Sequence, residues 1–386
     1  MKNILPLFIF RMSLSVILST SFSAHGFVKD PVYDDLEGAA LVRALLKDGK
    51  LELAQPEIKE LQKKNSLEAG VLLGQWYYLK GEWKAAIQEL ARISTSSTYY
   101  DEARIWQGRS AFLAKQMKEC VVFYSTVFKN KHAQEADALR RSHCEQKLGQ
   151  MDKAWNTVAQ ARGVFPTFPV EIEWITLMIQ LKLTHEGLFT IIEWLSKHAS
   201  PATHFLNVAE IFQTSGATGA TLVILEMARA QYPTNLDINL ALSQIYFQKG
   251  LMMAAEEGFR RAAITDGKYY YHTAELNRQT RRFERSLYFN ASVIDEKERL
   301  KQKIATYVDA NKYSLIASLD PVIQRSDLQK DDEIRYALAY SLVRTGDLEK
   351  PLKYLSQITK PELIEKTTVL RQTLIDCKEK KSVCRL

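Results

Sequence analysis

The hydrophobic pattern from Leu67 to Ile93 predicts two short amphipathic helices joined by a tight turn. Apolar and small residues recur three and four positions apart in each half, which is the spacing of one helix face. They are Leu73, Gly74 and Tyr77 in the first half, and Ala86, Leu90 and Ile93 in the second. We expect Gly81 to end the first helix, because glycine enters the left-handed conformation at little cost. Such a hairpin cannot bury its apolar face without a neighbour.

The same small and turn positions recur along the chain at a step of about 34 residues. From Gly74 this step reaches Gly108 and then Ser142, each a small residue in the middle of an expected first helix. Glycines also stand at most of the expected turns: Gly81, Gly149, Gly216, Gly250 and Gly346. Self-similarity at this period predicts a solenoid of stacked helical hairpins.

These positions resemble those of the tetratricopeptide repeat (TPR) family. The best matches centre on Gly74, Ala209, Ser243 and Ala339, and the resemblance covers nearly all of the chain after its first residues. It implies an all-α fold, a right-handed superhelical solenoid of about ten helix-turn-helix hairpins with a C-terminal capping helix.

Repeats near 170–200 and 265–330 match the family less well. In the first we expect the turn to be displaced toward Gly187, and in the second we expect Arg281 and Asn311 to stand at the turns. The prolines at 166 and 169 mark a candidate joint near 163–170, with an ordinary turn between repeats as the alternative. The expected organisation is a signal peptide (1–26), an N-terminal hairpin (27–66), a solenoid (67–358), and a capping helix with a basic tail (359–386).

The first 26 residues have the pattern of a secretory signal peptide. Lys2 and Arg11 precede a short apolar run, and small residues follow it. An uncleaved inner-membrane anchor is disfavoured, because Arg11 interrupts the apolar stretch and neither part approaches about 20 residues. Export would place the protein in the periplasm or at the periphery of the outer membrane. The formal net charge of +7 is mildly basic for a chain of 386 residues.

No pattern typical of an enzyme is present in the sequence: there is no glycine-rich phosphate loop, His-Glu-x-x-His pair or Gly-x-Ser-x-Gly elbow. We therefore expect no catalytic residues and no cofactor. A metal site from Cys120, His143 and Cys144 would match no zinc spacing, so none is expected. Two disulfides are candidates in an exported chain, Cys120–Cys144 and Cys377–Cys384, and a buried free thiol is the alternative for Cys120.

In the family, the first helices line a concave groove that binds partners. The resemblance assigns to this groove a mixture of aromatic, amide and basic side chains: Gln75, Tyr78, Arg109, Phe112, His143, Lys147, Gln244, Phe247, Tyr271, Arg278, Tyr340 and Arg344. This mixture suits an extended peptide of acidic or polar character, whereas solvation or packing between repeats is the alternative role. Some members of the family bind the C-terminal carboxylate of chaperones through a lysine and an asparagine in the groove. Here the matching positions hold other residues, for example Val71 and Gln75, so this carboxylate site is not expected.

The resulting hypothesis is a non-enzymatic scaffold for protein–protein interaction in the bacterial cell envelope, with roles such as secretion, appendage assembly or polysaccharide export. Its partners would be envelope proteins or extended peptide segments. The alternative is a periplasmic protein that binds glycan through its tryptophans, or anionic lipid or polysaccharide through the basic and aromatic stretch at 268–290. Nucleic acid is not expected as a partner of an exported chain.

Overall fold

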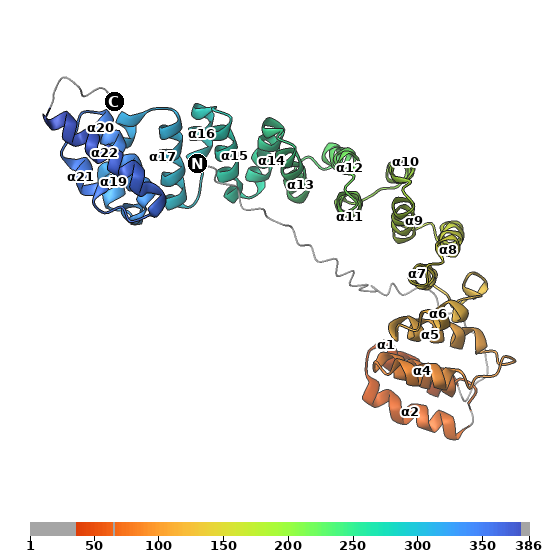
Figure 1. The fold of residues 1–386 in the computed structure, drawn as a ribbon. Coiled ribbons are helices and arrows are strands. Elements are labelled where there is room, and N and C mark those ends of the chain that lie inside the picture. Colours follow the sequence, from red (N-terminus) through yellow and green to blue (C-terminus); the bar gives the residue numbers. More distant parts are fainter. Residues whose placement is uncertain (1–35, 65, 380–386) are drawn as a thin grey trace. The chain divides into compact units, whose positions relative to one another are not determined.

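The computed structural model describes residues 36–64 and 66–379, and all regular structure in these ranges is helical (Figure 1). No helix in these ranges is long and apolar enough to cross a membrane. The expected signal peptide and the end of the basic tail lie outside the described residues. Export therefore stays a prediction from the sequence.

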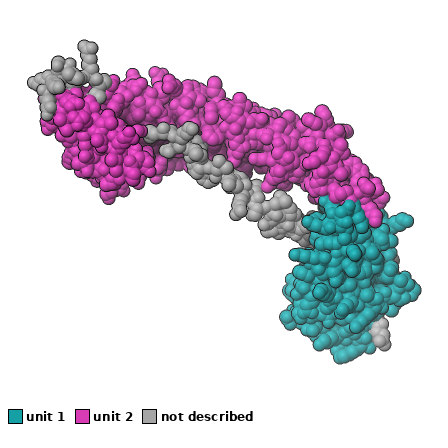
Figure 2. Space-filling model, in the orientation of Figure 1, with its two compact units in different colours: residues 1–150 teal, residues 151–386 magenta. Residues whose placement is uncertain are grey.

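The chain divides into two compact units, residues 1–150 and 151–386, which are coloured separately in Figure 2. The helices of unit 1 are α1 (Leu36–Lys47), α2 (Leu51–Lys63), α3 (Ala69–Leu79), α4 (Trp83–Leu90), α5 (Tyr100–Leu113), α6 (Met117–Phe123) and α7 (Glu135–Lys147), with the 3₁₀ turn η1 (Val127–Lys129).

Unit 2 continues the alternation of first and second helices. Its helices are α8 (Met151–Val164), α9 (Phe168–Gln180), α10 (Thr184–Lys197), α11 (Ala202–Thr214), α12 (Thr218–Gln231), α13 (Leu236–Gln248), α14 (Met252–Thr265), α15 (Tyr270–Gln279), α16 (Phe283–Asn290), α17 (Glu296–Asp309), α18 (Tyr313–Ser318), α19 (Asp320–Gln324), α20 (Asp332–Arg344), α21 (Lys350–Leu355) and α22 (Pro361–Glu379). The 3₁₀ turns η2 (Gly267–Tyr269) and η3 (Asp327–Lys330) lie between them.

Within each unit, consecutive helices pack as neighbours, and first helices also contact the first helices of adjacent hairpins. In unit 1, α3 packs against both α4 and α5, and in unit 2, α15 packs against α16 and α17. The last helix, α22, packs on α20 and α21 and buries Leu370 and Leu374, as expected for a cap. The predicted all-α class and the architecture of stacked hairpins ending in a cap are confirmed.

Small residues stand where two helices of a hairpin approach closely. A Cβ added at Gly74 would lie 2.4 Å from the side chain of Leu90, and one added at Gly108 would lie 2.6 Å from the ring of Tyr124. Real Cβ atoms do not tolerate such distances, because side chains already fill the interior to high density. The repeating small position is therefore a packing requirement.

The turns between first and second helices use the left-handed backbone conformation. Gly81 has a φ of 85°, and the predicted turn residues Arg281 and Asn311 have φ values of 58° and 55°. The expected displacement of one turn toward Gly187 is wrong. Lys182 takes the turn position with a φ of 67°, and Gly187 lies buried in α10, where an added Cβ would meet Met178 at 3.5 Å.

The weaker repeats have identifiable local causes. In the hairpin that begins with α17, the second helix is interrupted, and Pro321 stands at the start of α19 because proline is tolerated in the first turn of a helix. Pro166 lies in the short connection between α8 and α9, and Pro169 lies in the first turn of α9. A joint near 163–170 stays a prediction.

Candidate protein-binding site

Gln75, one of the predicted groove residues, belongs to a buried ionic network on the first helices of unit 1. Arg43 of α1 donates two hydrogen bonds to Glu102 of α5, at 2.8 and 3.0 Å, and also contacts Glu68. Gln75 donates its Nε2–H to Glu102 Oε1 at 2.8 Å. Burial alone would raise the pKa of Glu102, but the hydrogen bond and charge of Arg43 lower it overall. Gln75 therefore already has a partner inside the chain.

A second network surrounds Asp137, which is fully buried on α7. Arg109 of α5 donates to both carboxylate oxygens, at 2.9 and 2.7 Å, and Arg140 donates to one of them at 2.9 Å. The hydroxyl of Tyr124 donates to Asp137 Oδ1 at 3.0 Å. Burial favours the neutral acid, yet the hydrogen bonds and charge of Arg109 lower the pKa of Asp137 overall. Arg109 therefore links two neighbouring repeats.

Aromatic contacts involve other predicted groove residues of unit 1. Trp106 contacts both Tyr78 and Arg109. The ring centroids of Trp106 and Tyr78 are 5.1 Å apart, and the guanidinium of Arg109 lies 4.5 Å from the Trp106 centroid. Phe112 meets His143 edge to face at 5.6 Å. His143 and Lys147 are exposed on α7. These aromatic contacts engage the side chains of Tyr78, Arg109 and Phe112 inside unit 1.

In unit 2, Tyr271 and Arg278 of α15 are also engaged with the next first helix. Gln302 of α17 donates to the backbone carbonyl of Tyr271 at 2.9 Å. Arg278 is held by Glu275 on its own helix and by Asp309 of α17. Gln244 and Phe247 are half-buried on α13, and Phe247 packs against the buried cluster of Ala255, Phe259 and Leu276.

Tyr340 and Arg344 of α20 are brought together by Tyr313 of α18. Tyr340 meets Tyr313 edge to face at 5.4 Å, and the guanidinium of Arg344 lies 5.2 Å from the centroid of the same ring. Tyr336, one turn before Tyr340 on α20, lies 6.4 Å from the Tyr340 ring in a stacked arrangement. These side chains form a continuous aromatic surface with a basic rim.

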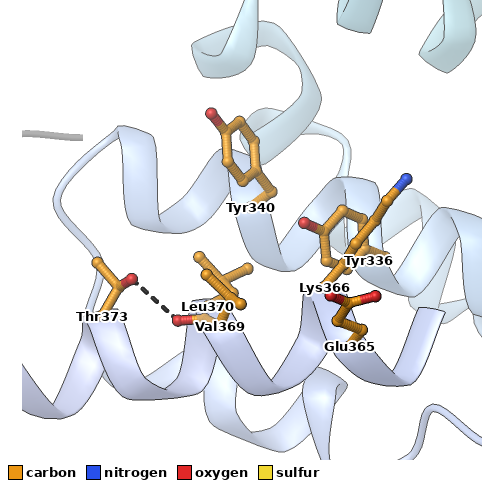
Figure 3. Close-up of a pocket in the computed structure, with 7 residues that line it drawn as sticks. All are labelled: Tyr336, Tyr340, Glu365, Lys366, Val369, Leu370 and Thr373. Carbon is orange, nitrogen blue, oxygen red and sulfur yellow. Dashed lines mark hydrogen bonds between the residues drawn. The ribbon is translucent and has the colours of Figure 1, made fainter.

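A pocket opens between this surface and the capping helix, with a volume of about 370 Å³. We call it the tyrosine pocket. Figure 3 shows Tyr340 standing opposite Val369 and Leu370 of α22, and Tyr336 beside Glu365 and Lys366. Its lining is Tyr336, Tyr340, Glu365, Lys366, Val369, Leu370 and Thr373. The hydroxyl of Thr373 donates a hydrogen bond to the backbone carbonyl of Val369 at 2.9 Å. The methyl group of Thr373 therefore remains for apolar contact with a ligand.

The lining suits an amphipathic side chain or a short peptide segment. Val369 keeps 63% of its surface exposed, so its side chain is accessible to a ligand in the pocket. Burial, with a smaller effect of Tyr340, raises the pKa of Tyr336, so its hydroxyl is a neutral donor and acceptor near pH 7. Aromatic rings with polar tips supply large contact area at low entropic cost.

The sequence predicted Tyr340 and Arg344 as groove residues, and it did not single out Tyr336 or the residues of α22 that line the pocket. Tyr336 and Tyr340 are four positions apart and therefore share a helix face, which is a signal that could have identified Tyr336. The sequence predicted α22 only as a cap, and a capping role does not indicate that the helix also lines a pocket. Of the proposed groove residues, only Tyr340 lines this pocket.

The stacked hairpins, the small-residue contacts and the left-handed turns define an α-helical repeat protein of tetratricopeptide-like class. No family model matches the chain, and no curated protein sequence does. Among solved structures it is similar to a tetratricopeptide repeat protein from Parabacteroides merdae, with 15% identity over 63% of this chain and 99% of that chain and a TM-score of 0.37. It is also similar to a human IFIT1 dimer with m7Gppp-AAAA (15% identity, 85% and 90% coverage, TM-score 0.30) and to MamA MSR-1 (18% identity, 44% and 96% coverage, TM-score 0.28).

Proposed function

We propose that this protein is a non-enzymatic scaffold for protein–protein interaction, and that it anchors an extended peptide segment of its partner at the tyrosine pocket. The observation that carries the proposal is the pocket itself. It combines two neighbouring tyrosines, an exposed valine and a lysine on the first-helix side of the last hairpin. Aromatic residues that remain accessible in a preformed depression are typical anchors of protein interfaces.

The chemistry of the rim indicates the character of the peptide. Lys366 lines the pocket, Arg344 lies over the ring of Tyr313, which contacts Tyr340, and Glu365 is the single acid among the lining residues. A peptide with one aromatic or aliphatic anchor and a neighbouring carboxylate would satisfy both the rings and the basic groups. The other groove residues, such as Gln75 and Arg109, support the surface through bonds inside the chain.

A peptide library displayed on phage and selected against the full chain tests this proposal. We expect selected peptides to lose at least about tenfold in affinity with Tyr336→Ala/Tyr340→Ala, since each lost aromatic anchor costs on the order of 1–2 kcal/mol. The matched control is Tyr288→Ala, which removes a tyrosine that is exposed on α16. Equal loss in both variants, or no selection at all, would overturn the proposal.

We further propose that the scaffold acts in the cell envelope after export, with roles in secretion, appendage assembly or polysaccharide export as the candidates. The signal-peptide pattern of residues 1–26 motivates this part. A fusion of alkaline phosphatase after residue 30 should be active when produced in bacteria. An inactive fusion, with an active control carrying a known signal peptide, would contradict export.

Glycan binding through tryptophan is the alternative, and the packing of the tryptophans disfavours it. Trp76 and Trp174 are buried, and Trp155 packs against Trp174 at 3.9 Å between ring centroids. Trp106 is covered by Arg109, and His198 stacks on Trp194 at 4.3 Å. Rings with covered faces offer no platform for a sugar.

A further inference from the structure

The turns that join first to second helices in unit 2 carry basic side chains at positions where glycine would be favoured. Lys182 and Arg281 have φ values of 67° and 58°, in the left-handed region that disfavours residues with a Cβ. At the equivalent glycines 216 and 250, an added Cβ would meet nothing within 4 Å. A side chain at this position therefore points into solvent and contributes no packing that would offset its unfavourable backbone.

Three consecutive turns concentrate this basic character. They are 249–251 between α13 and α14, 280–282 between α15 and α16, and 310–312 between α17 and α18. Their charged residues are Lys249, Arg281, Arg282 and Lys312, and no acid stands in any of the three turns. Because α14 packs on α13 and α15, and α16 packs on α15 and α17, the three turns follow one another along one edge of unit 2.

These cations differ from the basic groups that serve the fold. Arg278 pairs with Glu275 and Asp309, and Arg260 pairs with Glu257. By contrast, no ion pair to a described residue is formed by Lys249, Arg281 or Lys312, all of which are exposed. Arg282 belongs with the groups that serve the fold, because its Nη2 atom is buried and forms an ion pair with Glu256 at 3.6 Å. Positive charge is therefore available at this edge from Lys249, Arg281 and Lys312.

Exposed apolar side chains lie beside these cations. Leu251 immediately follows the turn glycine and is 50% exposed, and Met253 in the first turn of α14 is 67% exposed. Leu315 in the first turn of α18 is also exposed. Soluble polyanions would be bound by the basic groups alone, whereas a bilayer surface accepts both kinds of side chain. Anionic headgroups attract lysine and arginine, and the boundary with the acyl chains takes up leucine and methionine.

We propose that this edge, formed by Lys249, Leu251, Met253, Arg281, Lys312 and Leu315, docks on an anionic lipid bilayer. We call it the basic turn edge. The opposite edge of the same hairpins offers no equivalent, because its charges are balanced. Asp266 pairs with Lys268 at 2.7 Å in the turn before α15, and Asp295 caps α17 through Glu298 N. The proposal is independent of the tyrosine pocket, which lies on α20 and α22.

Cosedimentation of the full chain with vesicles tests the proposal directly. The probes are phosphatidylcholine vesicles with and without a phosphatidylglycerol fraction of about one third. We expect binding to the anionic vesicles alone. Lys249→Glu/Arg281→Glu/Lys312→Glu should lose at least about 100-fold, since each basic residue near such a surface contributes about fivefold and the glutamates add repulsion. The matched control, Lys197→Glu/Lys297→Glu/Lys330→Glu, makes the same charge change at or beside connections from second to first helices of unit 2 and should lose much less. Equal loss in both triples, or no binding to anionic vesicles, would overturn the proposal.

A single substitution at Arg281 separates lipid binding from stability. Arg281→Gly should raise the melting midpoint by about 2–4 °C, because it relieves the left-handed backbone, and should weaken vesicle binding about fivefold. Arg281→Lys should change neither property appreciably. Asn311→Gly, which alters no charge, should leave vesicle binding unchanged. Weaker binding in Asn311→Gly, or unchanged binding in Arg281→Gly, would contradict the role of this edge.

The apolar component has its own test. Leu251→Ser/Met253→Ser should weaken binding to anionic vesicles about tenfold or more, since two exposed apolar side chains lose their contact with the acyl boundary. Inorganic polyphosphate serves as the soluble anion. If polyphosphate binds the chain as tightly as the vesicles do, and this double variant binds vesicles normally, the ligand is a soluble polyanion and the lipid proposal fails.

Discussion

Individual side chains of the first helices have a structural task that their sequence positions did not reveal. The repeat phase correctly places Gln75 and Arg109 on the first helices, but the partners that hold them, Glu102 and Asp137, lie on the next repeat. A repeat pattern gives the face on which a residue lies. It does not give the rotamer of a long side chain, which is decided by charges that lie far away in the sequence.

The pairing of Arg109 with Asp137 predicts a large effect on stability. Arg109→Ala leaves a buried carboxylate with fewer donors, and breaking such a pair typically costs about 3–5 kcal/mol. Urea unfolding of the full chain followed by circular dichroism measures it. The control is Arg92→Ala, which removes an exposed pair with Glu89 and should change stability by less than about 0.5 kcal/mol. Similar values for both variants would contradict the structural role of Arg109.

The same carboxylates predict how stability depends on acid. The folded chain lowers the pKa values of Asp137 and Glu102 below their unfolded values of about 3.9 and 4.3. The unfolded chain therefore binds protons first as pH falls. This contribution to stability is complete above about pH 5 and is lost as pH falls below about 4 through the folded pKa values. Thermal melting from pH 6 to pH 3 should show a shallower acid decline in Asp137→Asn than in the original chain, and parallel curves would refute this assignment.

At the scale of helices and turns, spacing predicted more than residue type did. The period alone identified Arg281 and Asn311 as turn residues, and their φ values confirm it. The same reasoning failed at Lys182, because Gly187 was the nearest glycine and was taken as the turn. Gly187 instead takes the small position at a helix crossing. Glycine has both uses in this fold, and only packing distinguishes them.

The small position of a hairpin can be tested at Gly108. An added methyl group at 2.6 Å from the Tyr124 ring must displace that buried side chain, so Gly108→Ala should lose about 1–3 kcal/mol of stability. Gly163→Ala in α8 is the matched control, since its Cβ would meet nothing within 4 Å. That variant should gain about 0.5–1 kcal/mol, because alanine favours helix. Chemical denaturation of both variants decides between a packing constraint and a neutral position.

A disulfide between α6 and α7 covalently links two neighbouring repeats. Cys120 and Cys144 are bonded with an S–S distance of 2.08 Å and are separated by 24 positions in the sequence. Closing a loop of this length lowers the entropy of the unfolded chain, so Cys120→Ser/Cys144→Ser should lose about 3 kcal/mol. Melting with and without reductant checks this loss.

Reductant should lower the midpoint of the original chain and leave that of the double variant nearly unchanged. An original chain that is insensitive to reductant would show that this bridge does not stabilise the fold. The second candidate pair, Cys377–Cys384, includes a residue outside the described ranges and stays a prediction. Cys377→Ser/Cys384→Ser serves as the control for any effect of reductant at the C-terminus.

At the scale of the whole molecule, the period predicted the number and order of the hairpins but not how the chain divides. The boundary of the two units falls between Gln150 and Met151, one residue after Gly149. Gly149 is an ordinary turn glycine, so the local sequence does not distinguish this boundary from the other turns. Such a division reflects packing summed over many neighbours, which no local pattern records. The tyrosine pocket was likewise hidden, because it needs α22 beside α20, and two separate segments of sequence meet there.

The central claim is that the partner's peptide binds at the tyrosine pocket of unit 2. Hydrogen–deuterium exchange of the full chain, with and without a peptide selected against it, tests this claim most directly. We predict slower exchange of amides in 332–344 and 361–379, the helices that line the pocket, with little change in 236–290. Protection confined to other helices, or protection that persists in Tyr336→Ala/Tyr340→Ala, would contradict it.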